Sequence, residues 1–289
     1  MSPPPTSHIH LTDRTPRTTF PMRFAELWRY REVLKNFIAQ DLKVKYRRSA
    51  LGFFWSLLNP LLQMLVFTIV FSTILRFDLR GYVLFLLAGL LPWQFIAACI
   101  DGGCHCILNA EHLIRRQYFP KLVFPLSIVL QNLITLLLSM AVLLTLVGPF
   151  AGFNPSTNTL LLPLAILCIA AFAMGLAAFA AVATVHFRDM QHLIGVLVSM
   201  WFFLTPVVYP LLLPATETQP EKHVIPAHLQ PWFQLNPAYW MVNLFRVCIY
   251  NQHPPQLNEL LIPIAIAAVA LTAGLALFFR AERTLIFRL

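Results

Sequence analysis

Charged side chains are scarce in this sequence. Asp, Glu, Lys and Arg make up 11% of the 289 residues, and hydrophobic residues make up 58%. Soluble domains carry about 25% charged residues, so a surface that faces water on all sides is excluded. We therefore expect a polytopic membrane protein. Topology-setting loops and anionic lipid headgroups explain the net charge of +9, and we expect no nucleic-acid partner.

The sequence also lacks a phosphate-binding loop. None of its five lysines is followed by Ser or Thr, as the G-x-x-x-x-G-K-[ST] motif requires. The apolar runs hold almost no ionisable side chains, and Asp101, His105 and His192 lie near their expected inner ends. Ion-driven transporters use ionisable groups near mid-membrane, and a membrane hydrolase needs an acid, a base or a metal. Both classes are disfavoured, so any energy must come from a partner.

A disulfide framework is missing as well. The five cysteines are an odd number, and most lie in apolar runs, where Cys behaves as a small hydrophobic residue. The cluster Cys104-His105-Cys106 near Asp101 has no second pair of ligands. We expect neither a metal site nor catalytic residues in this chain.

A basic block followed by a long uncharged run organises the chain. Lys43, Lys45, Arg47 and Arg48 lie within eight residues, and no charged residue follows until Arg76. At ~1.5 Å per residue, the run is ~37 Å long as a helix, enough to cross a ~30 Å hydrocarbon core. The cations should stay on the cytoplasmic side.

The pattern of apolar runs predicts an all-α polytopic membrane protein with six transmembrane helices. The spans are expected at about 51–75, 82–106, 122–148, 159–185, 190–210 and 259–279. Pro60 should kink the first span, and Pro92 should interrupt the second. Of the 21 Lys and Arg residues, 17 lie in the segments expected inside, which places both termini in the cytoplasm.

Three further segments complete the predicted organisation. Residues 1–21 are rich in Pro, Thr and Ser and are expected to form a disordered cytoplasmic tail. Residues 22–48 combine an amphipathic interface helix, at 22–42, with the basic segment, and 49–289 form the transmembrane domain. Within that domain, the Pro-rich and aromatic segment 211–257 predicts short re-entrant or interfacial helices before the last span.

Four phrases in a fixed order carry a resemblance to a known family. They are YRRSALGFFWSLLNPLL (46–62), YFPKLVFPL (118–126), FRDMQHLIGVLVSMWFFLTPVVYP (187–210) and LNPAYWMVNLFR (235–246). With the amphipathic helix before them, they make the chain from about residue 22 onward similar to the membrane subunit of a polysaccharide ABC exporter. This is the ABC-2 type permease family, which serves O-antigen, capsule and teichoic acid export.

The resemblance implies a homodimer of permease subunits in the bacterial inner membrane, each docked on a separate nucleotide-binding ATPase subunit. ATP and Mg would bind to that partner, and this chain would be neither an enzyme nor a cofactor-binding protein. The implied cargo is a lipid-linked polysaccharide, O-antigen-like, moved from the cytoplasmic face outward.

The resemblance also implies where the ATPase docks. The segment Asn109–Tyr118, between the second and third spans, would be the coupling helix, and the turn at 186–189 would be a second contact. The expected contact residues are Asn109, Glu111, Arg115, Arg116, Tyr118, Arg188 and Asp189. As an alternative, the two arginines of the helix only set topology, and the Arg–Asp pair of the turn caps a helix.

The family's channel is lined mainly by the first and fifth spans. This would give a role to the aromatic residues Phe53, Phe54, Trp55, Trp201, Phe202 and Phe203. The electron-rich faces of aromatic rings attract sugar C–H groups weakly, and weak repeated sites suit a sliding polymer. As an alternative, these rings pack in the core or face lipid.

A lipid pyrophosphate headgroup would enter beside Tyr46, Arg47 and Arg48, because arginine matches phosphate geometry. The alternative is that these cations only anchor the chain on the cytoplasmic side, as the positive-inside rule predicts.

Two other functions stay open. One is an ABC-2 exporter of small drugs or lipids. The other is a polytopic membrane glycosyl- or acyltransferase, which would need Asp, Glu or His clustered on one helix face, a pattern that the sequence does not show.

Overall fold

A computed structural model describes residues 27–46, 52, 54–75, 79–116, 119–213, 222–223, 225–251 and 254–288. The elements in chain order are α2 (Arg31–Tyr46), α3 (Phe54–Leu75), α4 (Leu79–Asn109), α5 (Glu111–Arg116), α6 (Val123–Leu146), α7 (Gly148–Ala151), η1 (Thr157–Leu161), α8 (Leu162–His186), α9 (Met190–Leu204), β1 (Leu212–Leu213), β2 (Lys222–His223), η2 (Ala227–Leu229), α10 (Gln230–Gln234), α11 (Pro237–Ile249) and α12 (Leu257–Arg288). Apart from the short antiparallel pair β1–β2, these elements are helices, which confirms the predicted all-α class.

Four stretches of helix are long and apolar enough to cross a membrane: Gly81–Asn109, Val123–Leu146, Thr157–His186 and Leu257–Glu282. They correspond to the second, third, fourth and sixth predicted spans. The first and fifth correspond to α3 and α9, whose apolar stretches are shorter, Leu58–Phe71 and Met190–Leu204. The six-span count therefore stays a prediction, whereas the membrane-spanning character of the chain is established.

Several predicted boundaries differ from the structure. The expected fifth span, 190–210, is helical only to Leu204, because Thr205 precedes a proline and takes an extended conformation. The last helix continues beyond the expected end at 279 to Arg288, since no Gly or Pro follows to stop it. Pro92 lies inside an unbroken α4, so the expected interruption of the second span is wrong.

The interface helix predicted at 22–42 is helical at 27–29 and then forms α2, which runs on to Tyr46. One face of α2 lies against the start of α6: the ring centroid of Phe37 is 5.7 Å from that of Phe124. On the exposed face, Lys35 Nζ donates a hydrogen bond to Glu32 Oε1 at 3.0 Å, which lowers the pKa of that carboxyl group. This two-faced character agrees with the amphipathic prediction. The tail 1–21 lies outside the described residues.

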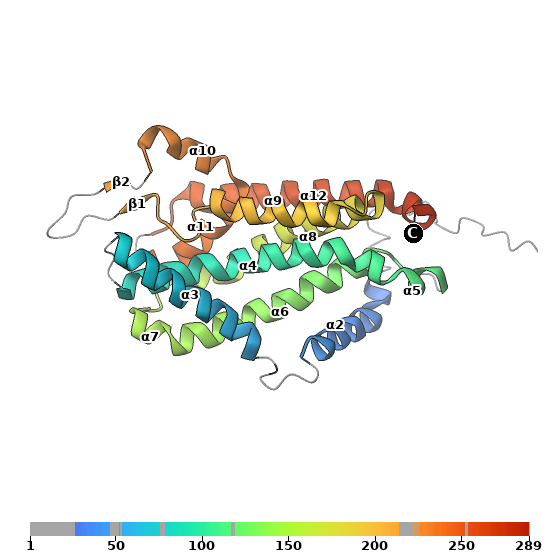
Figure 1. Ribbon diagram of the computed structural model, residues 1–289, viewed down its shortest axis with the longest axis horizontal. Helices are drawn as coiled ribbons and strands as arrows, with labels where there is room; N and C mark the ends of the chain where they lie inside the picture. The colour runs from blue at the N-terminus through green and yellow to red at the C-terminus, as the bar shows by residue number, and fades with distance from the viewer. Residues whose placement is uncertain are drawn as a thin grey trace, which may run out of the picture.

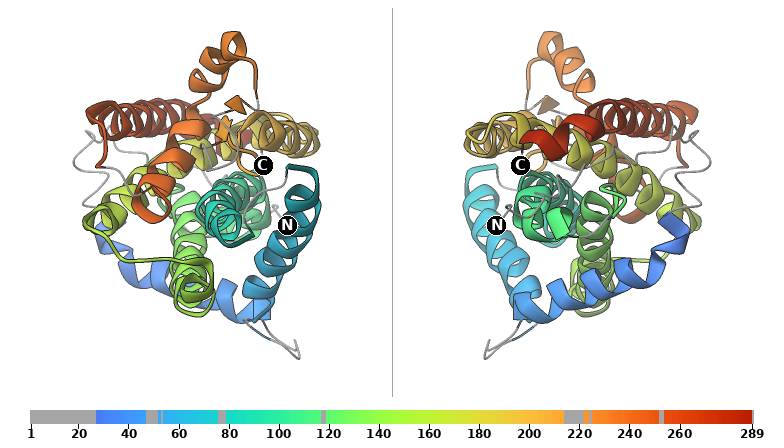
Figure 2. Two further views of the ribbon diagram at one scale, coloured as in Figure 1. Left: turned by 90° about the vertical axis from the view of Figure 1, so that its left-hand side faces the viewer. Right: turned by 90° about the vertical axis from the view of Figure 1, so that its right-hand side faces the viewer.

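Helix α4 lies at the centre of the bundle (Figure 2). It contacts α8, α6, α11, α3 and α9, and most of its apolar stretch is buried. Leu86, Leu90 and Ile96 are among its fully buried side chains. A helix that is apolar on every side can be stable only in such surroundings or in lipid.

The bundle has two distinct ends (Figure 1). Helices α2 and α5 and the C-terminal part of α12 lie at one end, and α7, α10, α11 and the strands lie at the other. We call these the α5 end and the α10 end. At the α5 end, the buried Lys121 donates a hydrogen bond to the carbonyl oxygen of Glu282, which joins the start of α6 to α12.

Helices α8 and α12 cross at two glycines. A Cβ atom on Gly175 would overlap the backbone of Ala270, and one on Gly274 would overlap the backbone of Gly175. Small residues of this kind let helices approach closely in lipid, where packing drives association. Gly175 of α8 is therefore a point of close approach to α12, while Ala177 of the same helix lies against Gly103 of α4.

Arg246 of α11 holds the segment that follows α9. Its Nη2 donates hydrogen bonds to the carbonyl oxygens of Pro206 at 2.6 Å and Val207 at 2.8 Å. Its guanidinium carbon lies 3.8 Å from the ring centroid of Phe85, and the residue is only 6% exposed. From the sequence, Arg246 is one of the four cations outside the segments expected in the cytoplasm. In the structure it is buried and donates hydrogen bonds to backbone carbonyl groups.

We expect that Gly175→Ala or Gly274→Ala destabilises the protein by about 2 kcal/mol or more, the usual cost of overpacking. Thermal unfolding in detergent measures this effect. Gly195→Ala in α9 is the matched control, because no atom lies within 4 Å of its added Cβ. Equal unfolding temperatures for all three variants would contradict the proposed close approach of α8 and α12.

We expect that Arg246→Met lowers the unfolding temperature by roughly 5 °C or more, because two buried carbonyl groups lose their donor. Limited proteolysis should also cut residues 205–211 faster than in the wild type. Arg246→Lys keeps a donor, so its unfolding temperature should lie between those of the wild type and Arg246→Met. Wild-type stability and wild-type cleavage in Arg246→Met would show that the two hydrogen bonds do not hold this segment.

Candidate functional site

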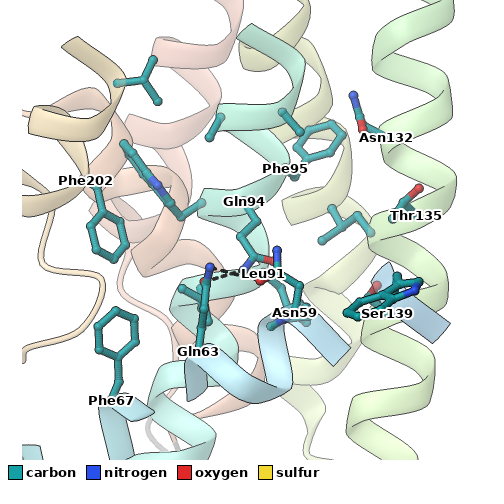
Figure 3. A pocket seen from close by; sticks show the side chains of 18 of the residues that line it. Asn59, Gln63, Phe67, Leu91, Gln94, Phe95, Asn132, Thr135, Ser139 and Phe202 are labelled. Carbon is teal, nitrogen blue, oxygen red and sulfur yellow. Dashed lines mark hydrogen bonds between the residues drawn. The ribbon is translucent and has the colours of Figure 1, made fainter. Parts of the chain in front are cut away.

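A cavity of about 860 Å³ lies between α3, α4, α6 and α9. Seven of the 21 residues that line it carry uncharged polar side chains, among apolar and aromatic neighbours (Figure 3). They are Asn59 and Gln63 of α3, Gln94 of α4, Asn132, Thr135 and Ser139 of α6, and Ser199 of α9. A hollow of this size and polarity, inside a bundle of apolar helices, is the strongest candidate for a functional site.

Two of these amides meet across the gap between α3 and α4. Gln94 Nε2 donates a hydrogen bond to Gln63 Oε1 at 2.9 Å, and Figure 3 shows the two side chains pointing toward each other. Gln63 Nε2 in turn lies 3.4 Å from Asn59 Oδ1, one helical turn away. The three residues form an amide ladder that can both donate and accept hydrogen bonds.

The α6 side of the cavity presents a second polar row. Asn132, Thr135 and Ser139 follow one another at spacings of three and four residues, which places them on one face of the helix. Asn132 Nδ2 donates to the carbonyl oxygen of Ile128 at 3.0 Å, and Thr135 Oγ1 donates to that of Gln131 at 3.2 Å. Both therefore bond within α6 and still face the cavity.

The aromatic residues predicted to line a channel separate into groups. Trp55, Phe202 and Phe203 line the cavity together. Trp201 instead packs edge-on against Trp93, with ring centroids 5.6 Å apart, and its Nε1 donates to Asn236 Oδ1 at 2.8 Å.

Two further members of that set lie elsewhere. Phe54 is largely exposed, and Phe53 lies outside the described residues. The structure thus brings three of the six rings to one cavity, and their channel role stays a prediction.

A groove of about 540 Å³ lies closer to the α5 end, between α4 and α9. Asp101 and His105 of α4 face Gln191 and His192 of α9 across it. His105 Nε2 lies 3.9 Å from Asp101 Oδ1, and Gln191 Nε2 lies 3.3 Å from His192 Nε2. No group of three or more His, Cys, Asp or Glu side chains within the described ranges is arranged to hold a metal ion.

Helix α5 carries three of the seven predicted ATPase contacts. Asn109 is the last residue of α4, and Glu111, Arg115 and Arg116 lie on α5. Arg115 Nη2 forms an ion pair with Glu111 Oε1 at 2.8 Å, and Arg116 is exposed. The short helix projects from the end of the bundle (Figure 1), so its charged side chains are accessible.

The second predicted contact lies in the turn between α8 and α9, where Arg188 and Asp189 are both exposed. The carbonyl oxygen of Asp189 accepts hydrogen bonds from the backbone N–H groups of His192 and Leu193, so this residue is the N-cap of α9, although its side chain makes no capping hydrogen bond.

Other predicted contact residues lie outside the description. Tyr118, Arg47 and Arg48 are not among the described residues, and for Tyr46 only the helical backbone is described.

The polar lining was not predicted from the sequence. A signal was present, because Asn59 and Gln63 are four residues apart in an otherwise apolar run, and Asn132, Thr135 and Ser139 repeat at helical spacing. An inventory of uncharged polar residues in each span would have found both rows, whereas attention to ionisable residues passed over them.

Comparison with known proteins places the chain in a family. A family model described as "ABC-2 type transporter" matches residues 32–250. The O-antigen export system permease protein RfbA of Myxococcus xanthus is 32% identical over 253 residues, which are 88% of this chain and 94% of that protein.

Two further relatives are more distant. The RfbA protein of Klebsiella pneumoniae is 29% identical over 63% of this chain and 69% of its own length. The polysialic acid transport protein KpsM of Escherichia coli is 25% identical over 86% of this chain and 92% of its own length. Since the family model covers most of the sequence and the Myxococcus protein aligns almost end to end, this membrane-spanning chain belongs to the ABC-2 type transporter family.

Proposed function

We propose that this chain is the permease subunit of an ATP-driven exporter that moves a lipid-linked, O-antigen-like polysaccharide across the bacterial inner membrane. The main support is its similarity to a protein named as an O-antigen export permease, over 94% of that protein's length. The uncharged polar cavity agrees with this function, because amides and hydroxyl groups pair with sugar hydroxyls.

ATP hydrolysis belongs to a separate nucleotide-binding subunit that holds ATP and Mg. The absence of a G-x-x-x-x-G-K-[ST] motif in the sequence supports this division of labour. The exposed charges of α5, together with Arg188 and Asp189, supply the docking contacts at the α5 end. The ion pair within α5 stabilises the short helix by roughly 0.2–0.5 kcal/mol.

The working unit is a homodimer with six spans in each protomer and both termini in the cytoplasm. None of the α9 residues is buried in the isolated chain, so α9 has a free surface for a second copy. Trp55, Phe202 and Phe203 contact the sliding glycan, and Phe53, Phe54 and Trp201 belong to the same aromatic region. Tyr46, Arg47 and Arg48 receive the lipid pyrophosphate headgroup.

Deleting the gene should remove long-chain polysaccharide from the cell surface and leave lipid-linked polymer inside the cell. Surface labelling and fractionated polymer analysis measure both pools, and the wild-type gene should restore export. Normal surface polysaccharide in the deletion strain, together with increased sensitivity to drugs, would favour the drug-exporter alternative.

Reversing the charges at Arg115 and Arg116 to Glu should uncouple the transporter, because the docking helix then meets its partner with the wrong sign. We expect export to fall by more than tenfold, while the membrane level of the chain stays normal. ATPase activity of the purified complex, measured with and without polymer, is the second readout. The control is Arg31→Glu on α2, an exposed cation outside α5. Coupled transport at wild-type rates would remove α5 from the interface.

A further inference from the structure

We propose that the cavity and the inner groove form one binding track for an uncharged, hydroxyl-rich chain, and that Asp101 at its inner mouth rejects anionic polymers. This inference rests on the proposed export function and names the class of its cargo, a neutral glycan.

The two hollows are continuous along α4 and α9. Ser199 and Phe203 line both the cavity and the groove. A smaller hollow of about 310 Å³ shares Ala98 and Val198 with the cavity, and Asp101 and Gln191 with the groove. The path therefore runs from Asp101, near the α5 end, along α4 to the half-buried Gln94.

The lining suits hydroxyl groups better than it suits other ligands. An amide donates and accepts hydrogen bonds, as a sugar hydroxyl does. Ser139 is only 3% exposed, and it lines the cavity with Asn132 and Thr135. A hydroxyl or amide group that lines a hollow can pair with hydroxyl groups of whatever fills it. A lipid tail could not supply such a partner, since hydrocarbon leaves polar groups unsatisfied.

Charge decides which glycans fit. Among the described residues that line the three hollows, Asp101 is the only Asp or Glu, and none is Lys or Arg. Its side chain is 79% exposed, with His105 beside it on α4 and His192 opposite on α9. A carboxylate accepts hydrogen bonds from hydroxyl groups and repels other carboxylates. Rejection of the wrong ligand by like charge is a common source of specificity.

The experiment compares two polymers in cells that lack the chromosomal copy of this gene and retain the partner ATPase. One polymer is a lipid-linked neutral hexose polymer, and the other has one hexuronate in each repeat. Surface polymer is measured for each and divided by the amount of chain that co-purifies with the ATPase. Wild-type protein should export the neutral polymer about tenfold better, a difference that corresponds to one or two lost or repelled contacts.

Asp101→Lys should reverse this preference, and the isosteric Asp101→Asn should reduce it without reversal. Paired replacement of the amides, Gln63→Leu with Gln94→Leu, should lower export of the neutral polymer about tenfold. The matched control is Gln234→Leu, which removes an exposed amide of α10, away from the path, and should change nothing.

The outcomes separate the two proposals. If the wild type exports neither polymer, the proposed function is wrong. If it exports polymers but neither Asp101 variant changes the ratio, the charge rule is wrong and the function stands. If the paired Leu variant exports the neutral polymer normally, the amide ladder is not part of the track. Because Asp101 is exposed and its Asn variant is isosteric, that variant should assemble even if the Lys variant does not.

Discussion

A polar backbone group inside hydrocarbon must find its partner within the protein, and this constraint fixes the segment that follows α9. The helix ends at Leu204, which leaves its last carbonyl groups without helical N–H donors. Asn236 Nδ2 donates to one of them, the carbonyl oxygen of Leu204, at 3.2 Å. Arg246 donates to the carbonyl oxygens of Pro206 and Val207, just beyond the helix. Asn236 caps α11 and Arg246 lies within it, and α11 packs on the central α4. The centre of the bundle therefore holds the segment that follows α9.

Once the segment after α9 is held in this way, at the α10 end, α9 does not have to pack tightly along its length. Close packing is concentrated elsewhere, at the glycine crossing of α8 and α12 and around α4. The cavity between α3, α4, α6 and α9 is partly open, since Asn59, Gln63 and Ser199 in its lining are exposed. Burying these amide groups without hydrogen-bond partners would cost free energy. This explains why they face a hollow rather than the apolar surface of a neighbouring helix.

Much of the fold could be predicted, because apolar runs bounded by charges determine which segments become long helices. The position of the segment after α9 could not be predicted, since Arg246, which donates to its carbonyl oxygens, lies about forty residues further along the chain. The separate roles of Trp201, Phe202 and Phe203 could not be predicted either. Successive helical residues point about 100° apart, so three adjacent rings cannot share one surface. Trp201 therefore faces Trp93 and Asn236, while Phe202 and Phe203 face the cavity. The polar lining depends on which faces of α3, α4 and α6 meet, and packing alone decides that.

The chemistry of this cavity also bears on why a permease without its own ATPase site would need a partner for energy. A hydrogen bond between an amide and a hydroxyl contributes only about 1 kcal/mol net, and contact with an aromatic face contributes about as little. Successive sugar units can therefore exchange along such a surface with low barriers in either direction. A track of this kind has no intrinsic direction, because each forward step replaces one weak contact with an equivalent one. Direction must then come from a cycle that acts on the helices themselves. Helix α5 follows α4 after a single residue, and α4 carries both Asp101 and Gln94, so force applied at the docking helix would reach the track through one continuous element.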